Sequence, residues 1–125
     1  MEQSFVAWAK VRAGRLPKVK LGIGDDAAIL AAHSEDTVIT TDMLMDGVHF
    51  HMSEASPASI GRKLVNVSLS DLAAMAAEPE AVFLSLCLPP KGPNGMPRDI
   101  LAAEMYEAVC DICELHWIAI AGGDT

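Results

Sequence analysis

Acidic side chains recur at turns and strand ends of this sequence, where they can converge on one site. The set comprises Asp25, Asp26, Asp42, Asp71 and Asp124. Carboxylates that share a cleft repel one another at neutral pH, so they take up protons or bind cations. Mg²⁺ suits such a set because it prefers oxygen ligands and usually keeps positions open for phosphate oxygens. Aspartate is also common in turns that have no function, so the prediction of a metal site depends on the joint pattern.

The stretch GIGDDAAI, residues 22–29, places two negatively charged side chains next to each other. Glycine adopts backbone angles that other residues avoid, so a turn here lets Asp25 and Asp26 point the same way. The closest bases in the sequence are Lys18 and Lys20, and the residues that follow the acids are small and apolar. A bound cation would therefore compensate the two adjacent negative charges.

Asp71 falls in the middle of an apolar stripe of a predicted helix over 57–77. At about 100° per residue, the stripe consists of Ile60, Leu64, Val67 and Met75, and an opposite stripe consists of Val65, Leu69, Leu72 and Ala76. An ionised carboxylate held among such side chains is costly unless it is compensated, which favours a role as a metal or phosphate ligand. The alternative is that the helix bends near Ser70 and that Asp71 faces water.

Local patterns predict strands that alternate with helices in the second half of the chain. A capping serine, Ser4, begins a short first helix, and β-branched residues predict a strand over 38–41 that ends at Asp42. A second short strand over 47–51 follows a turn at 46–47. Ser56 and Pro57 begin the helix over 57–77. The later predicted elements are a strand over 81–88, a loop over 89–97, a helix over 98–114 and a strand over 117–121. The predicted fold class is α/β (α+β), with a mixed sheet packed with helices.

Composition limits the classes of partner. The chain has 125 residues, 51% of them hydrophobic, and a formal net charge of −8, which indicates one folded domain and argues against nucleic acid as a partner. No apolar run is long enough for a membrane span, and the first residues do not resemble a secretory signal. An odd number of cysteines, 3, favours a reducing cytoplasm. Because the sequence stops directly after an apolar run and a glycine turn, we expect a fragment of a longer protein.

Four motifs carry these residues in order: GIGDDAAIL, TTDMLMDGVHF, GRKLVNVSLSDLAAMAAEP and GGDT. Together they resemble the amino-terminal domain of the thiamine-monophosphate kinase family, in the superfamily of aminoimidazole ribonucleotide synthetase. The acidic GDD and GGDT are superfamily-wide, whereas TTD…GVHF with VNVSLSDLAAM points to the thiamine-phosphate branch. The resemblance implies that residues 1–125 form an amino-terminal domain for ATP and Mg²⁺ binding and for dimerisation, with the carboxy-terminal domain absent.

The resemblance also implies a reaction, a set of ligands and partners. The reaction is transfer of the γ-phosphoryl group of ATP to thiamine monophosphate by a cytoplasmic homodimer, which asks the protein mainly for positioning and charge neutralisation. The implied Mg²⁺ ligands are Asp25, Asp26, Thr40, Thr41, Asp42, Asp71 and Asp124, several of which, with Gly123, also lie at the ATP phosphates. His49 would lie near the thiamine phosphate, and Lys63 and Asn66 would line the nucleotide side. K⁺ is left open as a further cofactor.

The chain also departs from the family pattern. Family members usually read AAMGA, whose last four positions correspond to Ala74-Met75-Ala76-Ala77 in this chain. They are also well over twice as long, so this part alone is expected to bind weakly and to be inactive. Three rival interpretations stay open: another ATP-dependent enzyme of the superfamily, a non-catalytic dimerisation or nucleotide-binding module, and, more remotely, a carboxylate-metal phosphatase. Selenophosphate synthetase is disfavoured because no cysteine precedes Cys87. We interpret Cys110 and Cys113 as core residues, since ligands at these helical spacings do not converge with His116.

Overall fold

The computed structural model describes residues 2–125. Its elements, in chain order, are α1 (Glu2–Ala13), β1 (Val19–Leu21), β2 (Ile29–Leu30), α2 (Pro57–Ala74), β3 (Ala81–Ser85), the 3₁₀ turn η1 (Pro93–Gly95), α3 (Arg98–Leu115) and β4 (Ala119–Asp124). The mixture of helices and strands confirms the α/β (α+β) class. In place of one mixed sheet there are two small ones, an antiparallel β1–β2 pair and a parallel β3–β4 pair.

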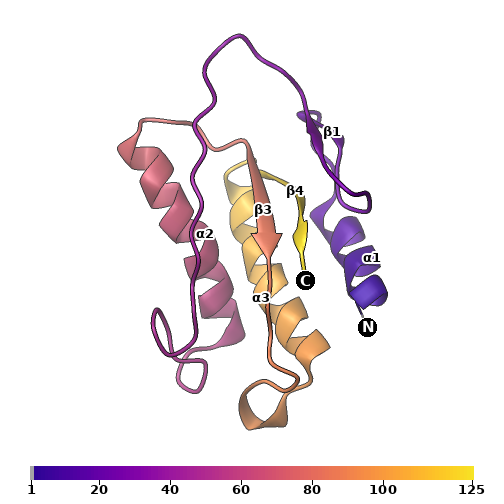
Figure 1. Cartoon of the computed structure of the whole chain (residues 1–125), viewed down its shortest axis with the longest axis vertical. Coiled ribbons are helices and arrows are strands. Elements are labelled where there is room, and N and C mark those ends of the chain that lie inside the picture. Colours follow the sequence, from indigo (N-terminus) through magenta and orange to yellow (C-terminus); the bar gives the residue numbers. More distant parts are fainter. Residues whose placement is uncertain (1) are drawn as a thin grey trace.

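The β3–β4 pair lies in the middle of the molecule, with α2 and α1 on either side of it (Figure 1). Helix α3 connects the parts, because it packs against α2, α1 and β4. The β1–β2 pair lies beyond the end of α1, and a long segment without regular structure leads from β2 over the top of the molecule and down along α2 (Figure 1). The two stretches that carry most of the candidate site, 22–28 and 37–46, are therefore on opposite sides of the central strands.

The core is centred on α3. Leu101 and Val109 are completely buried and Cys110 and Cys113 nearly so, and they pack with Ile60 and Val65 of α2 and with Ile118 and Ile120 near β4. Each fully buried aliphatic side chain contributes about 1.5–3 kcal/mol of hydrophobic free energy. The interpretation of Cys110 and Cys113 as core residues is confirmed.

Three local predictions are wrong. Ser4 lies inside α1, which already begins at Glu2. Residues 38–41 and 47–51 are not strands, although their sequence favours that conformation. A strand needs a neighbour to pair its backbone groups, and residues 2–125 provide none for these two segments. At 46–50 the chain instead forms a turn, in which Gly47 N donates to Phe50 O at 2.7 Å and Met52 N donates to Asp46 Oδ1 at 2.8 Å.

The other predicted elements are found with small shifts of their ends. Helix α2 begins as expected, since Ser56 Oγ accepts from Ser59 N at 3.1 Å and Pro57 occupies the first turn. The strands over 81–88 and 117–121 appear as Ala81–Ser85 and Ala119–Asp124, and the helix over 98–114 appears as Arg98–Leu115. Among residues 2–125, no helix combines the length and apolar character needed to cross a membrane.

Candidate functional site

Asp42 and Asp71 lie together where the segment 37–45 runs along α2. Ser68 Oγ donates a hydrogen bond of 2.7 Å to Asp42 Oδ2, and Thr40 Oγ1 donates one of 3.2 Å to Asp71 Oδ2. Ser68 and Asp71 are three residues apart on α2, so they occupy neighbouring turns of one face. The fold thus brings two of the predicted carboxylates to neighbouring contacts between the segment 37–45 and α2.

The burial predicted for Asp71 is wrong. Asp71 is exposed, and Met75, on the same stripe, is 67% exposed. The physical reason is that the second half of α2 leans away from α3 and the central strands (Figure 1). The buried residues of α2, Ile60, Gly61 and Val65, therefore all lie in its first half, and Asp71 faces the segment 37–45 and solvent.

The remaining acids lie at two other places, the GIGDD turn and the end of β4. A Cβ placed on Gly22 would lie 3.9 Å from Ala121 O, so the GIGDD turn starts beside β4, the strand that ends at Asp124. Asp25 and Asp26 are both exposed, and Asp26 N donates to Asp25 Oδ1 at 2.8 Å. The structure therefore brings Asp42 and Asp71 together, but within residues 2–125 no hydrogen bond or ion pair joins Asp124 to Asp25 or Asp26. Among residues 2–125, no three His, Cys, Asp or Glu side chains are arranged to hold one metal ion.

Gly123 fixes the backbone just before Asp124. Its φ of +149° falls in a region that favours glycine, and a Cβ at this position would lie 1.8 Å from Leu84 O. The register of β3 and β4 shifts between Val82 and Phe83, and Leu86 N then donates to Asp124 O at 2.8 Å. Glycine is thus required for the close contact that places Asp124 at the end of the sheet.

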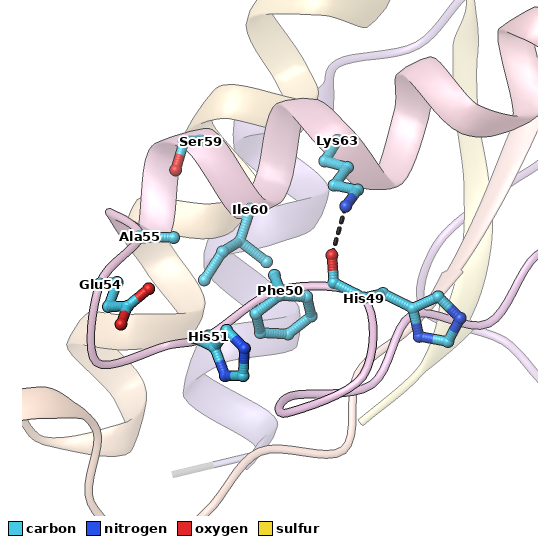
Figure 2. A pocket seen from close by; sticks show the side chains of 8 residues that line it. All are labelled: His49, Phe50, His51, Glu54, Ala55, Ser59, Ile60 and Lys63. Carbon is cyan, nitrogen blue, oxygen red and sulfur yellow. Dashed lines mark hydrogen bonds between the residues drawn. The ribbon is translucent and has the colours of Figure 1, made fainter.

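His49 and Lys63 line one hollow of about 330 Å³ beside the start of α2 (Figure 2). The other residues that line it are Phe50, His51, Glu54, Ala55, Ser59 and Ile60. Lys63 Nζ points at the main-chain oxygen of His49 and donates a hydrogen bond to it (Figure 2). Met45 N donates to His49 Nδ1 at 3.0 Å, so the neutral ring carries its proton on Nε2 as a donor. An ammonium and an imidazole N–H are suitable donors for a phosphate group.

The donor chemistry around Asp42 and Asp71 fits Mg²⁺. The side-chain atoms there that could bind a metal ion are all oxygens, from the two carboxylates and the hydroxyls of Thr40 and Ser68. Mg²⁺ is commonly held by one or two carboxylates together with substrate phosphates. Thr41 is exposed on the same segment, and Asn66 is exposed on α2 between Lys63 and Ser68.

Two residues of the site were not predicted. Ser68 is the hydroxyl partner of Asp42, and the signal for it was its spacing of three from Asp71 on one helix. Lys10 of α1 brings a positive charge to the GIGDD turn, because a Cβ on Gly24 would lie 3.1 Å from Lys10 Nζ. The bases considered from the sequence were Lys18 and Lys20, and no local signal connects Lys10 with this turn.

The fold and the acidic motifs define the class of protein. The sequence profile of the family described as AIR synthase related protein, N-terminal domain, matches residues 24–125. The chain belongs to this family, as the motifs indicated.

The relatives within the family point to one branch. Over 132 residues the chain is 39% identical to the thiamine-monophosphate kinase of Rhodopirellula baltica, covering 99% of this chain and 40% of that protein. It is 37% identical to the thiamine-monophosphate kinase of Bacillus subtilis, covering 86% of this chain and 32% of that protein. A crystal structure of thiamine-monophosphate kinase from Stenotrophomonas maltophilia K279a matches 98% of this chain and 37% of its own, with a TM-score of 0.78 and 33% identity. The chain spans about 40% or less of the length of these relatives.

Proposed function

We propose that this chain is the nucleotide- and metal-binding part of a thiamine-monophosphate kinase. In this reaction the bond between the γ-phosphorus of ATP and its bridging oxygen breaks, and a phosphate oxygen of thiamine monophosphate takes over the phosphoryl group. The products are ADP and thiamine diphosphate. The observation that carries the proposal is that Asp42 of the segment 37–45 and Asp71 of α2 both lie where that segment contacts one face of α2, in a chain that is 39% identical to a protein of that name.

Each part of the site has a role in this proposal. Bound Mg²⁺ supplies positive charge that offsets the charge of the phosphates. Asp42 and Asp71 hold the cation beside α2, and Asp25, Asp26 and Asp124 are further proposed ligands. Thr40, Thr41 and Gly123 lie next to these acids, and Asn66 faces the nucleotide. K⁺ is a further candidate cofactor of the acidic groups.

The donors proposed for the acceptor phosphate are His49, whose ring points away from the other residues of the hollow in Figure 2, and Lys63. His49 offers Nε2–H, and Lys63 has two more N–H donors besides the one directed at the His49 carbonyl. The sequence had suggested the nucleotide side for Lys63. Its contact with His49 instead supports a role at the acceptor phosphate.

The proposed assembly is a cytoplasmic homodimer. Support comes from the segment that leads to the site, where Ile39 is 82%, Met43 76% and Val48 71% exposed. A second copy would cover these apolar side chains and provide the neighbour that the predicted strand over 38–41 needs. The cytoplasmic location is supported by three unpaired cysteines.

Calorimetric titration of the chain with ATP tests the proposal. We expect ATP to bind in the presence of Mg²⁺ and to lose its affinity when EDTA removes the metal. Asp42→Asn and Asp71→Asn should each weaken binding by about tenfold or more, which corresponds to about 1.4 kcal/mol. Asp99→Asn, on the first turn of α3, is the control and should leave the affinity unchanged.

Two results would count against the kinase proposal. ATP binding that is independent of Mg²⁺ would remove the metal site. Absence of ATP binding in a chain that forms stable dimers would favour the rival interpretation, a non-catalytic dimerisation module.

A further inference from the structure

Two reciprocal hydrogen bonds connect the segment 37–45 with α2. In one, the helix supplies the donor, Ser68, and the segment supplies the acceptor, Asp42; in the other, the segment supplies Thr40 and the helix supplies Asp71. The lower-numbered residue of the segment contacts the higher-numbered residue of the helix, so the two run in opposite directions, as Figure 1 shows. Each carboxylate is thus oriented by a hydroxyl from the other element.

The choice of hydroxyl partners preserves the negative charge. A lysine or arginine partner would orient a carboxylate but would also cancel the charge that attracts a cation. The ion pairs among residues 2–125 are made by Arg12 and His33 with carboxylates other than those of Asp42 and Asp71. Both hydrogen bonds use Oδ2, and an ionised carboxylate has about four lone-pair sites. Oδ1 of Asp42 and of Asp71 therefore stays available to a ligand.

We propose that Ser68 and Thr40 are positioning residues, which hold the carboxylates of Asp42 and Asp71 in the orientation that binds the divalent cation. The inference rests on the proposed function and assigns Ser68 a role that neither the sequence motifs nor the relatives' names provide. Ser68 acts through Asp42, and Thr40 acts through Asp71. Outer hydrogen-bond partners of this kind commonly change metal affinity by about 10–100-fold when they are removed.

The test uses Mn²⁺ as a probe, because carboxylate and water ligands suit both Mn²⁺ and Mg²⁺. Its dissociation constant for the 125-residue chain is measured from the electron paramagnetic resonance signal of free Mn²⁺. Ser68→Ala should raise the dissociation constant about tenfold, and Ser68→Thr, which keeps the hydroxyl, should recover most of the affinity. Ser70→Ala, an exposed serine on the same helix, is the matched control and should have no effect.

A double-mutant cycle shows whether Ser68 acts through Asp42. In the Asp42→Asn background, Ser68→Ala should cause no further loss of Mn²⁺ affinity, because the group that it orients is gone. Thr40→Val, which is nearly isosteric, and Thr40→Ser, which keeps the hydroxyl, test the second hydrogen bond by the same reasoning. This second pair also covers the case in which Ser68→Ala fails to fold.

Failure of this inference can be distinguished from failure of the proposed function. Unchanged Mn²⁺ affinity in Ser68→Ala and Thr40→Val, or an equal loss in the Asp42→Asn background, would overturn the positioning roles and leave the metal site standing. A wild-type chain that binds no Mn²⁺ would overturn both.

Discussion

Gly61 of α2 lies directly against the main chain of Met105 in α3. A Cβ placed on Gly61 would be 2.3 Å from Met105 O and 3.1 Å from Ala108 Cβ. The two helices therefore approach each other at a point where no side chain fits. This contact sets the position of the first half of α2, from which Lys63, Ser68 and Asp71 follow along the helix.

Replacing Gly61 by alanine should destabilise the chain. In an open helix the same change stabilises by roughly 0.5–1 kcal/mol, but here the methyl group forces α2 and α3 apart at a cost of about 1–3 kcal/mol. Urea unfolding followed by circular dichroism measures the difference. An increase in the free energy of unfolding would contradict the close contact.

Ala76 is strained at the end of α2, and Ala76→Gly should relieve the strain. Ala77 N donates to Leu72 O at 2.9 Å and Ala76 N donates to Ala73 O at 3.0 Å, the hydrogen bonds of a helix end that favours glycine. Ala76 has a φ of +53°, and this is the position where the family motif AAMGA has glycine. We expect a gain of about 1 kcal/mol in the free energy of unfolding.

The matched control for this change lies three residues earlier. Ala73→Gly, inside α2, should lower the free energy of unfolding by roughly 0.5–1 kcal/mol. If both glycines lowered it, the left-handed conformation of Ala76 would be wrong.

The buried thiols predict a loss of stability at alkaline pH. Burial raises the pKa of Cys110 to about 12 and that of Cys113 to about 11, from 9.0. Above about pH 9 the unfolded chain loses these protons while the folded chain keeps them, so the unfolded state binds fewer protons. The free energy of unfolding is therefore unaffected by these thiols below pH 9 and falls above it, by up to about 1.4 kcal/mol per pH unit and thiol.

Unfolding by urea at several pH values from 8 to about 11 measures this slope. The double variant Cys110→Ala/Cys113→Ala should be less stable, because it loses buried volume, but its slope should be shallower. Burial also raises the pKa of Tyr106, which leaves a residual slope at the alkaline end. Cys87→Ala, at an exposed cysteine, should keep the slope of the wild type; an identical slope in the double variant would contradict the assignment.

Arg12 attaches α1 to α3 through three carboxylates. Its guanidinium lies 2.7 Å from Glu107, 3.1 Å from Asp111 and 2.5 Å from Glu114, and its hydrogen bonds, first to Glu107, raise the pKa of Arg12. Arg12→Ala leaves three like charges along one face of α3, so we expect a loss of about 1–2 kcal/mol.

Salt separates this charge effect from lost packing. Because the three carboxylates are largely exposed, about 1 M NaCl should reduce the cost of Arg12→Ala clearly. Arg15 donates only to main-chain oxygens of Val19 and Lys20, so the cost of Arg15→Ala should depend little on salt. Equal salt dependence in the two variants would contradict the role of charge.

The sequence by itself determined the local features of this protein. Hydrophobic periodicity and the Ser56-Pro57 start are properties of neighbouring residues, so they specified α2 and α3 and the positions of β3 and β4. The candidate acidic ligands could also be predicted from the sequence, because whether a side chain can bind a cation depends on the type of that one residue. The family followed from these motifs, and its profile matches residues 24–125.

Only the tertiary structure decided which of these residues meet. Asp42 is 26 residues from Ser68, and Thr40 is 31 residues from Asp71, so their contacts depend on how the segment 37–45 lies on α2. The same holds for Lys10 at the GIGDD turn and for the exposure of Asp71, which follows from the tilt of α2. The β-branched run at 38–41 predicted a strand from local preference alone, but a strand also needs a paired neighbour, and the described chain does not place one beside it.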